Sequence, residues 1–145
     1  MSKEKLIEAM QVVLADSYTL YLKTQNFHWH VKGPHFQSLH LLFEGQYMDL
    51  ASAVDTIAER ILALGSKAPA TYAEFAALTT IKEGDSSLLA DQMVQTLADD
   101  QEAMLNTLNH ALKMAQEAGD EGSITLLGDR IAAHEKNRWM LVSSL

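Results

Sequence analysis

Five side chains of the kinds that bind transition metals recur between residues 28 and 59 of this 145-residue sequence. Imidazole nitrogen combined with carboxylate oxygen suits iron, manganese or zinc, and carboxylates can also bridge two ions and hold both Fe(II) and Fe(III). These residue types predict a metal centre. The alternative is a solvated carboxylate face with one incidental histidine. The five candidate ligands are His28, His40, Glu44, Asp55 and Glu59.

Four of the five candidates belong to one expected helix, because only Gly45 weakens the helical pattern between Phe36 and Leu64. At about 100° per residue, the three carboxylates fall about 40°, 60° and 100° around the helix from His40, so the four share one face. At about 1.5 Å per residue, His40 and Glu59 are nevertheless roughly 28 Å apart. One ion cannot bind both.

The spacing of these four residues is palindromic. The midpoint between His40 and Glu59 coincides with the midpoint of the inner pair, Glu44 and Asp55. If a second copy of the helix packs antiparallel about a two-fold axis at this midpoint, each histidine end meets the Asp55 and Glu59 end of its partner. We therefore expect two identical metal sites per dimer, with His28 joining each from the preceding helix.

Composition narrows the chemistry further. Cysteine is absent, which leaves histidine and carboxylates as the metal ligands. A hydrophobic content of 48% over residues 1–145 predicts a single domain with a substantial core. The net charge of −8, with scattered basic residues, disfavours binding to phosphate backbones. We see no leader and no membrane span, and expect a soluble, cytoplasmic protein.

Helical periodicity predicts four long helices, over about residues 3–30, 36–64, 85–118 and 123–143. Asp85 or Ser86 is the expected cap of the third. The connection before it contains Thr71 followed by Glu74, a capping box that predicts a short helix over residues 71–78. Four helices with one long crossover predict an all-α, ferritin-like four-helix bundle.

Other polar groups have simpler interpretations. His30 and His35 flank a loop and are expected to be structural or at the surface. His134 lies in the last helix without an inward carboxylate at a metal-binding interval, which predicts a core or surface position. A solvated face is expected for the acidic group Asp99, Asp100 and Glu102.

Three segments resemble a known family. They are FHWHVKGPHFQSLH at residues 27–40, VDTIAER at 54–60 and AAHEKNRWML at 132–141. Together with Glu44, they closely resemble the Dps family (DNA protection during starvation), the twelve-subunit miniferritins, and the resemblance extends over nearly the whole chain. It implies a homododecameric shell with a ferroxidase centre for two iron ions at each two-fold interface.

The resemblance assigns roles by position. His28, His40 and Glu44 of one subunit, with Asp55 and Glu59 of its partner, correspond to the family's iron ligands. Many members have aspartate where Glu44 stands, and the longer arm would reposition or weaken the second iron.

Further roles follow from the same resemblance. Trp29 corresponds to the tryptophan beside the centre, which is thought to accept oxidising equivalents, and an interface anchor is its alternative role. Asp120 and Asp129 correspond to acidic residues of the three-fold pore through which iron enters, and Thr125 stands where a third acidic residue is usual.

The resemblance also implies the chemistry. Fe(II) would be oxidised, preferably by hydrogen peroxide, without release of hydroxyl radical, and the ferric product stored in the shell, which protects against oxidative stress. Zinc and manganese are the alternative metals. Only Lys3 and Lys5 stand at the N-terminal end of the first helix, so we do not expect the direct DNA binding of members with a lysine-rich tail. The alternatives are a nucleoid-associated, DNA-coating protein without significant ferroxidase activity and a structural assembly that holds zinc.

Overall fold

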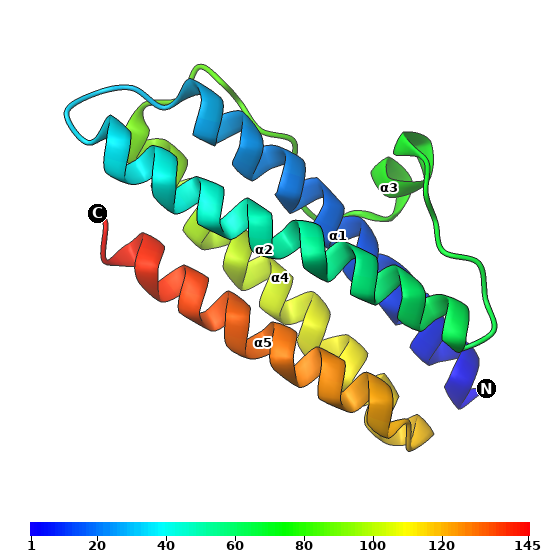
Figure 1. The fold of residues 1–145 in the computed structure, drawn as a ribbon. Helices are drawn as coiled ribbons and strands as arrows, with labels where there is room; N and C mark the ends of the chain where they lie inside the picture. Colours follow the sequence, from blue (N-terminus) through cyan, green and yellow to red (C-terminus); the bar gives the residue numbers. More distant parts are fainter.

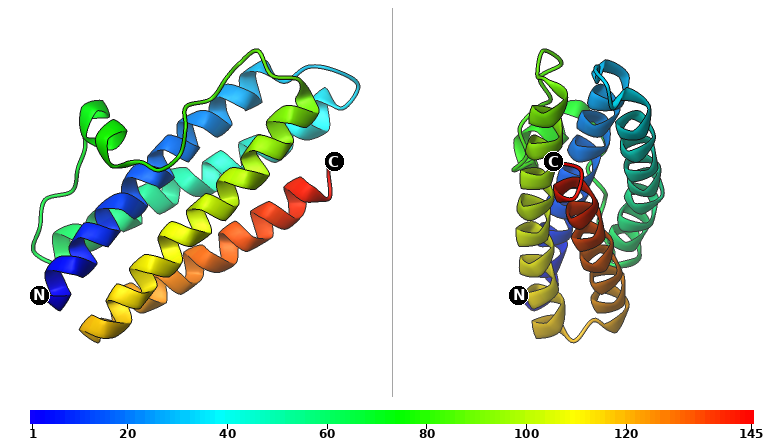
Figure 2. Two further views of the ribbon diagram at one scale, coloured as in Figure 1. Left: turned by 180° about the vertical axis from the view of Figure 1, so that it is seen from behind. Right: turned by 90° about the vertical axis from the view of Figure 1, so that its left-hand side faces the viewer.

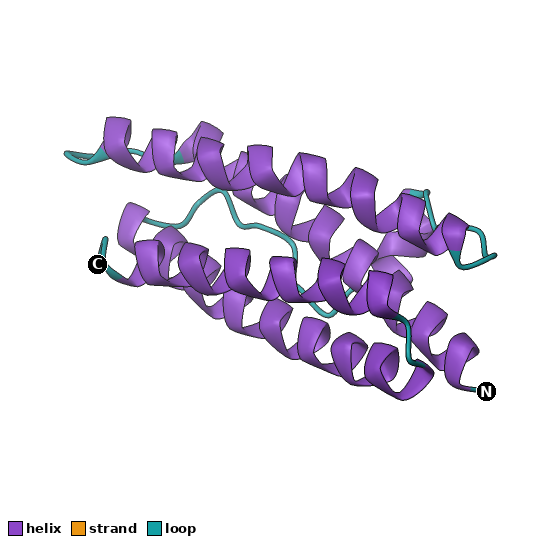
Figure 3. Cartoon of the chain, turned by 60° about the horizontal axis from the view of Figure 1, so that its bottom comes forward, coloured by secondary structure: helices purple, strands orange, loops and turns teal.

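Five helices account for the regular structure of the computed structural model, which describes all 145 residues (Figures 1 and 3). No β-strand is present. None of the helices combines the length and the hydropathy that crossing a membrane requires. In chain order they are α1 (Ser2–His30), α2 (Phe36–Ala63), α3 (Tyr72–Leu78), α4 (Ala90–Ala118) and α5 (Glu121–Val142).

The four long helices form two antiparallel pairs, α1 with α2 and α4 with α5 (Figure 1). α1 also packs on α4 and joins the pairs, whereas α2 and α5 meet only over a narrow contact. The segment between α2 and α4 runs back along the bundle, so α2 and α4 point the same way (Figure 2). A four-helix bundle with one long crossover is the ferritin-like arrangement that the sequence predicts.

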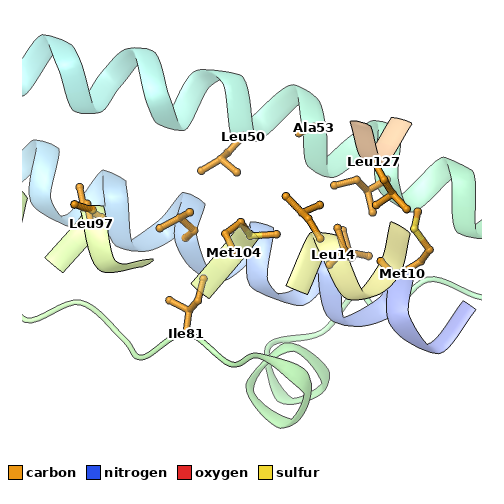
Figure 4. Packing of buried hydrophobic residues seen from close by; sticks show 14 of the residues in the cluster. Met10, Leu14, Leu50, Ala53, Ile81, Leu97, Met104 and Leu127 are labelled. Atoms are coloured by element: carbon orange, nitrogen blue, oxygen red, sulfur yellow. The ribbon is translucent and has the colours of Figure 1, made fainter. Parts of the chain in front are cut away.

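The core lies between the long helices and also takes in the crossover. Phe27 of α1, Phe43 of α2 and Met104 of α4 are among its largest fully buried side chains. Figure 4 shows Leu50 of α2 and Ile81 of the crossover in the same cluster. Burial of each such side chain contributes about 1.5–3 kcal/mol, so the crossover is fastened to the bundle at Ile81.

A buried carboxylate is the second anchor of the crossover. Asp16 of α1 is fully buried, and its Oδ1 accepts hydrogen bonds from the Thr79 hydroxyl and the Thr80 amide at 2.7 and 2.6 Å. Its Oδ2 accepts from the hydroxyls of Thr80 and of Thr107 in α4, each at 2.7 Å. Four neutral donors satisfy the carboxylate, which thereby joins the crossover to two helices.

The short helix in the crossover is confirmed. Thr71 precedes α3, and its Oγ1 accepts a hydrogen bond from the Glu74 amide at 3.1 Å. The Glu74 carboxylate accepts one from the Ala70 amide, also at 3.1 Å. These bonds satisfy amides that the start of a helix leaves unpaired. Phe75 of α3 stacks on Tyr18 of α1 with ring centroids 4.8 Å apart, so α3 lies on the outside of α1 (Figure 2).

The start of α4 differs from the sequence prediction, whereas the other long helices begin and end within two residues of it. The sequence predicts Asp85 or Ser86 as the cap, but α4 begins at Ala90. The Asp85 carboxylate instead accepts hydrogen bonds from the amide and the hydroxyl of Ser87, at 2.9 and 2.6 Å, and closes a local turn. Aspartate forms such turns as readily as helix caps, so its presence does not decide between them.

One member of the acidic group on α4 is half-buried, contrary to the expected solvated face. The Asp100 side chain is 13% exposed and lies 2.8 Å from Nζ of Lys23 in α1, whose side chain is 4% exposed. Burial raises the pKa of the Asp100 carboxyl, and the hydrogen bond and charge of Lys23 act in the opposite direction. The Lys23–Asp100 ion pair therefore belongs to the contact between α1 and α4.

Candidate metal centre

Two histidines from consecutive helices lie face to face. His28 is in the last turn of α1 and His40 in the second turn of α2, and the short loop between the helices brings them together. Their rings stack with centroids 3.7 Å apart and an angle of 12° between their planes. Nδ1 of His28 lies 2.7 Å from the backbone carbonyl oxygen of His40, and Nδ1 of His40 lies 2.7 Å from that of His28.

This reciprocal arrangement determines which ring nitrogen carries the hydrogen. A carbonyl oxygen can only accept, so Nδ1 of His28 and Nδ1 of His40 both donate. In the neutral rings Nε2 then keeps its lone pair, as metal binding requires. A backbone carbonyl bonded to the second nitrogen is a usual support for a metal-binding histidine, because it fixes the orientation of the ring.

Glu44 adds a carboxylate one turn after His40. Donor atoms of His28, His40 and Glu44 all lie within 4.8 Å of one another. Nε2 of His28 is 3.8 Å from Oε1 of Glu44. His28 is 5% exposed and the Glu44 side chain 47% exposed, so the cluster opens to the surface on its carboxylate side. Two imidazoles and one carboxylate fit Fe(II), Mn(II) or Zn(II).

The remaining two candidates do not join this cluster within one chain. Asp55 and Glu59 are exposed on α2 and belong to no metal-binding group. Asp55 follows Glu44 by 11 residues, and at about 1.5 Å per residue the two are about 16 Å apart along the helix. A single chain therefore presents three candidate ligands at one place and two further carboxylates at another.

The face of α2 that carries these carboxylates also exposes large apolar side chains. Leu41, Met48 and Leu62 are 54%, 60% and 56% exposed. At about 100° per residue they fall about 100°, 80° and 40° around the helix from His40, within the arc that holds the ligands. A surface on which large exposed apolar side chains lie among polar ones is typical of a surface that another chain covers.

Aromatic side chains border the cluster. Phe36 stacks on the His40 ring with centroids 4.9 Å apart, and Tyr47 meets the His28 ring edge to face at 5.2 Å. The sequence prediction does not include these two residues, although Phe36 lies one turn before His40. Trp29 follows His28 but points outward, with 59% of its surface exposed.

The two aspartates assigned to a pore lie apart from this cluster and from each other. The Asp120 carboxylate accepts hydrogen bonds from Nη2 of Arg60 at 2.8 and 3.0 Å and from the Ser123 hydroxyl. The pKa of Asp120 is held below its usual range, first by the hydrogen bond from Ser123 and then by the hydrogen bond and the charge of Arg60. Partial burial of Asp120 acts in the opposite direction. Asp129 is exposed on α5, nine residues further along the chain.

His30, His35 and His134 occupy the positions that the sequence predicts for them. His134 is fully buried, with Nδ1 2.6 Å from Oε1 of Gln101 and Nε2 2.9 Å from Nη2 of Arg130. His30 is exposed, and its Nδ1 lies 2.7 Å from the backbone oxygen of Asn26. None of them belongs to a metal-binding group.

The helical bundle with one crossover, together with a histidine and carboxylate cluster on its helices, defines a ferritin-like protein. A family model described as the ferritin-like domain matches residues 7–145. The chain is 40% identical over 138 residues to DNA protection during starvation protein 2 of Bacillus anthracis, covering 95% of this chain and 94% of that protein.

Solved structures give the same result. A Dps protein from Bacillus brevis matches with a TM-score of 0.95 and 34% identity, over 98% of this chain and 95% of that one. A Dps protein from Vibrio cholerae, described as a member of a broad superfamily of ferritin-like diiron-carboxylate proteins, matches with a TM-score of 0.93 and 34% identity, over 98% and 89%. The chain belongs to the Dps family within the ferritin-like superfamily.

Proposed function

We propose that this protein oxidises ferrous iron at a dinuclear centre completed by two copies of the chain. His28, His40 and Glu44 of one copy would face Asp55 and Glu59 of the other. The observation that carries the proposal is that the three-residue cluster has oriented donor atoms but too few for two ions. The matching carboxylates lie exposed at the other end of the same helix face.

The donor set suits the proposed oxidation. Carboxylates are hard ligands for both Fe(II) and Fe(III), and neutral imidazole favours transition metals over magnesium and calcium. Each of two Fe(II) ions gives up one electron, and the O–O bond of hydrogen peroxide breaks. The two oxygens leave as hydroxide, which solvent protons convert to water. Because both electrons are supplied together, no hydroxyl radical is released.

Membership of the Dps family supports the proposed product and assembly. We propose that twelve chains form a shell in the cytoplasm and that ferric product collects inside it. Asp129 is the candidate for the iron entry pore, since Asp120 is already paired with Arg60. Trp29 is 59% exposed, so its indole is available both for contact with a neighbouring copy and for oxidation.

We propose that any protection of DNA comes from the removal of iron and peroxide rather than from coating. The net charge of −8 makes the surface repel phosphates. A gel-shift experiment with plasmid at low and moderate salt distinguishes the two activities, and we expect no retardation. Retardation at moderate salt would instead support the DNA-coating function.

Complementation between two inactive variants tests the shared centre. His28→Ala damages one half of each site and Asp55→Ala the other, so each variant alone should lose rapid Fe(II) oxidation by peroxide. In a mixed dimer, one site combines both damaged halves and the other combines both intact halves. Random co-assembly should therefore restore about one quarter of the wild-type rate.

The control is Glu135→Ala, which removes an exposed carboxylate from α5 instead of α2. It should oxidise iron at the wild-type rate, as measured by absorbance of the ferric product. Recovery of activity in the co-assembled variants supports a centre shared between chains. A mixture that stays inactive, or single variants that keep the wild-type rate, refutes the assigned centre.

A further inference from the structure

A polar contact on α5 holds the end of α2 that carries Asp55 and Glu59. Nη2 of Arg60 donates to both carboxylate oxygens of Asp120, at 2.8 and 3.0 Å, and Nε of Arg60 donates to Oγ of Ser123 at 3.1 Å. Hydrogen bonds between charged groups are roughly twice as strong as those between neutral groups.

The guanidinium group occupies a space that only glycine leaves free. A Cβ atom added to Gly122 would lie 2.6 Å from Nη1 of Arg60 and 2.7 Å from Cζ and Nη2. At such distances one of the two groups must move, and the guanidinium group, at the end of a flexible side chain, is the one that can. An alanine at residue 122 would therefore displace the guanidinium group from the position in which it contacts Asp120 and Ser123. We refer to Arg60, Asp120, Gly122 and Ser123 as the Arg60 clamp.

The Arg60 clamp is the polar link between α5 and the C-terminal half of α2. The two helices meet only over a narrow contact. Their other polar links involve Gln46, which donates to the Asn137 carbonyl at 3.4 Å, and Asp49, which lies 2.9 Å from Nη2 of Arg130. Both lie in the N-terminal half of α2, close to the cluster of two histidines and Glu44.

Arg60 directly follows the proposed ligand Glu59 in the last turns of α2, where a helix end would otherwise fray. We propose that Arg60 is a positioning residue of the metal centre, which fixes the Asp55 and Glu59 half so that it meets the histidine half of the partner chain. This inference rests on the proposed function. It adds that a contact with α5 sets the affinity of that half for metal.

The test uses two substitutions that disturb the clamp in different ways. Arg60→Gln removes the charge, whereas Gly122→Ala keeps every charge and fills the space of the guanidinium group. Gly128→Ala is the matched control, because it lies on the same helix and a Cβ atom there meets no atom within 4 Å. Alanine is favoured over glycine in a helix, so helix propensity alone predicts a gain in stability for both glycine variants.

Titration of the assembled protein with Co(II), without oxidant, reports metal affinity independently of activity. Arg60→Gln and Gly122→Ala should weaken Co(II) binding by about 10-fold, the lower end of the loss typical when a group that positions a metal ligand is removed. Arg60→Lys should lose less, because it keeps the charge facing Asp120. In the oxidation assay, the Fe(II) concentration for half-maximal rate should rise more than kcat falls. Gly128→Ala should match wild type in both measurements.

Asp55→Ala separates failure of the clamp from failure of the centre. If Asp55→Ala weakens Co(II) binding and Gly122→Ala does not, the clamp is overturned and the centre stands. If neither substitution weakens binding, both are overturned. If Gly122→Ala weakens binding in a protein that does not oxidise iron, the clamp is supported and the ferroxidase function is overturned. Size-exclusion elution at the wild-type volume shows that each variant is still assembled.

Discussion

His134 should make the protein lose stability in mild acid. Its ring is fully buried, and it is held between Oε1 of Gln101 at 2.6 Å and Nη2 of Arg130 at 2.9 Å. Burial, followed by the charge of Arg130, lowers its pKa to about 3, although Asp49 acts in the opposite direction. His134 is therefore neutral at any pH at which the fold is normally handled, and its Nδ1 hydrogen is donated to Gln101.

The magnitude follows from the difference between the folded and unfolded pKa values. Above the unfolded value of 6.5, neither state protonates His134 and the native state has its full stability. Between 6.5 and about 3, the unfolded chain binds a proton that the native state does not, so stability falls by about 1.4 kcal/mol per pH unit. The loss at about pH 4.5 is about 3 kcal/mol.

The assay compares wild type with His134→Gln in urea at about pH 7.5 and about pH 4.5, at one protein concentration because assembly contributes to stability. Glutamine can donate to Gln101 and accept from Arg130 without titrating. Wild type should lose about 3 kcal/mol more than the variant between the two pH values. The exposed His35→Gln is the control and should follow wild type. Equal losses in wild type and His134→Gln would refute the reasoning.

Three further predictions concern stability. Asp16→Ala leaves four donors without their acceptor and should cost about 3–5 kcal/mol, with loss of hydrogen-exchange protection at the Thr80 amide; a protected amide would contradict the anchor. Lys23→Met should cost about 3 kcal/mol in urea unfolding because it leaves the half-buried Asp100 carboxylate without a cation, and adding Asp100→Leu should recover most of that loss. Thr71→Ala should destabilise α3 by about 1 kcal/mol in hydrogen exchange, while exchange in the four long helices stays unchanged.

Helical spacing makes much of the candidate centre predictable. The rotation per residue is nearly constant in an α-helix, so the order of residues along α2 is enough to place His40 and its carboxylates on one face. The short loop that reverses the chain after His30 likewise makes a contact between His28 and His40 foreseeable. The shared midpoint of the ligand pairs depends only on residue numbers.

Charged groups away from helix starts are less predictable. Asp100 is one of several acidic residues on an otherwise solvated face, but it is half-buried and paired with Lys23 from a distant part of the chain. The same holds for Arg60, whose partner Asp120 is 60 residues away. Ion pairs of this kind depend on how the helices pack, so local sequence patterns do not predict them.

By itself, the sequence determined the all-α class, the four long helices, the capped short helix and the shared face of α2 that carries the candidate ligands, because propensity, capping and helical rotation act within a few residues. The tertiary structure alone decided the rest. It directs each Nδ1 of His28 and His40 to the backbone of the other residue, which leaves both Nε2 atoms free for metal. It also places the guanidinium group of Arg60 beside Gly122 and Ser123. Such contacts form only when segments distant in the sequence pack against each other.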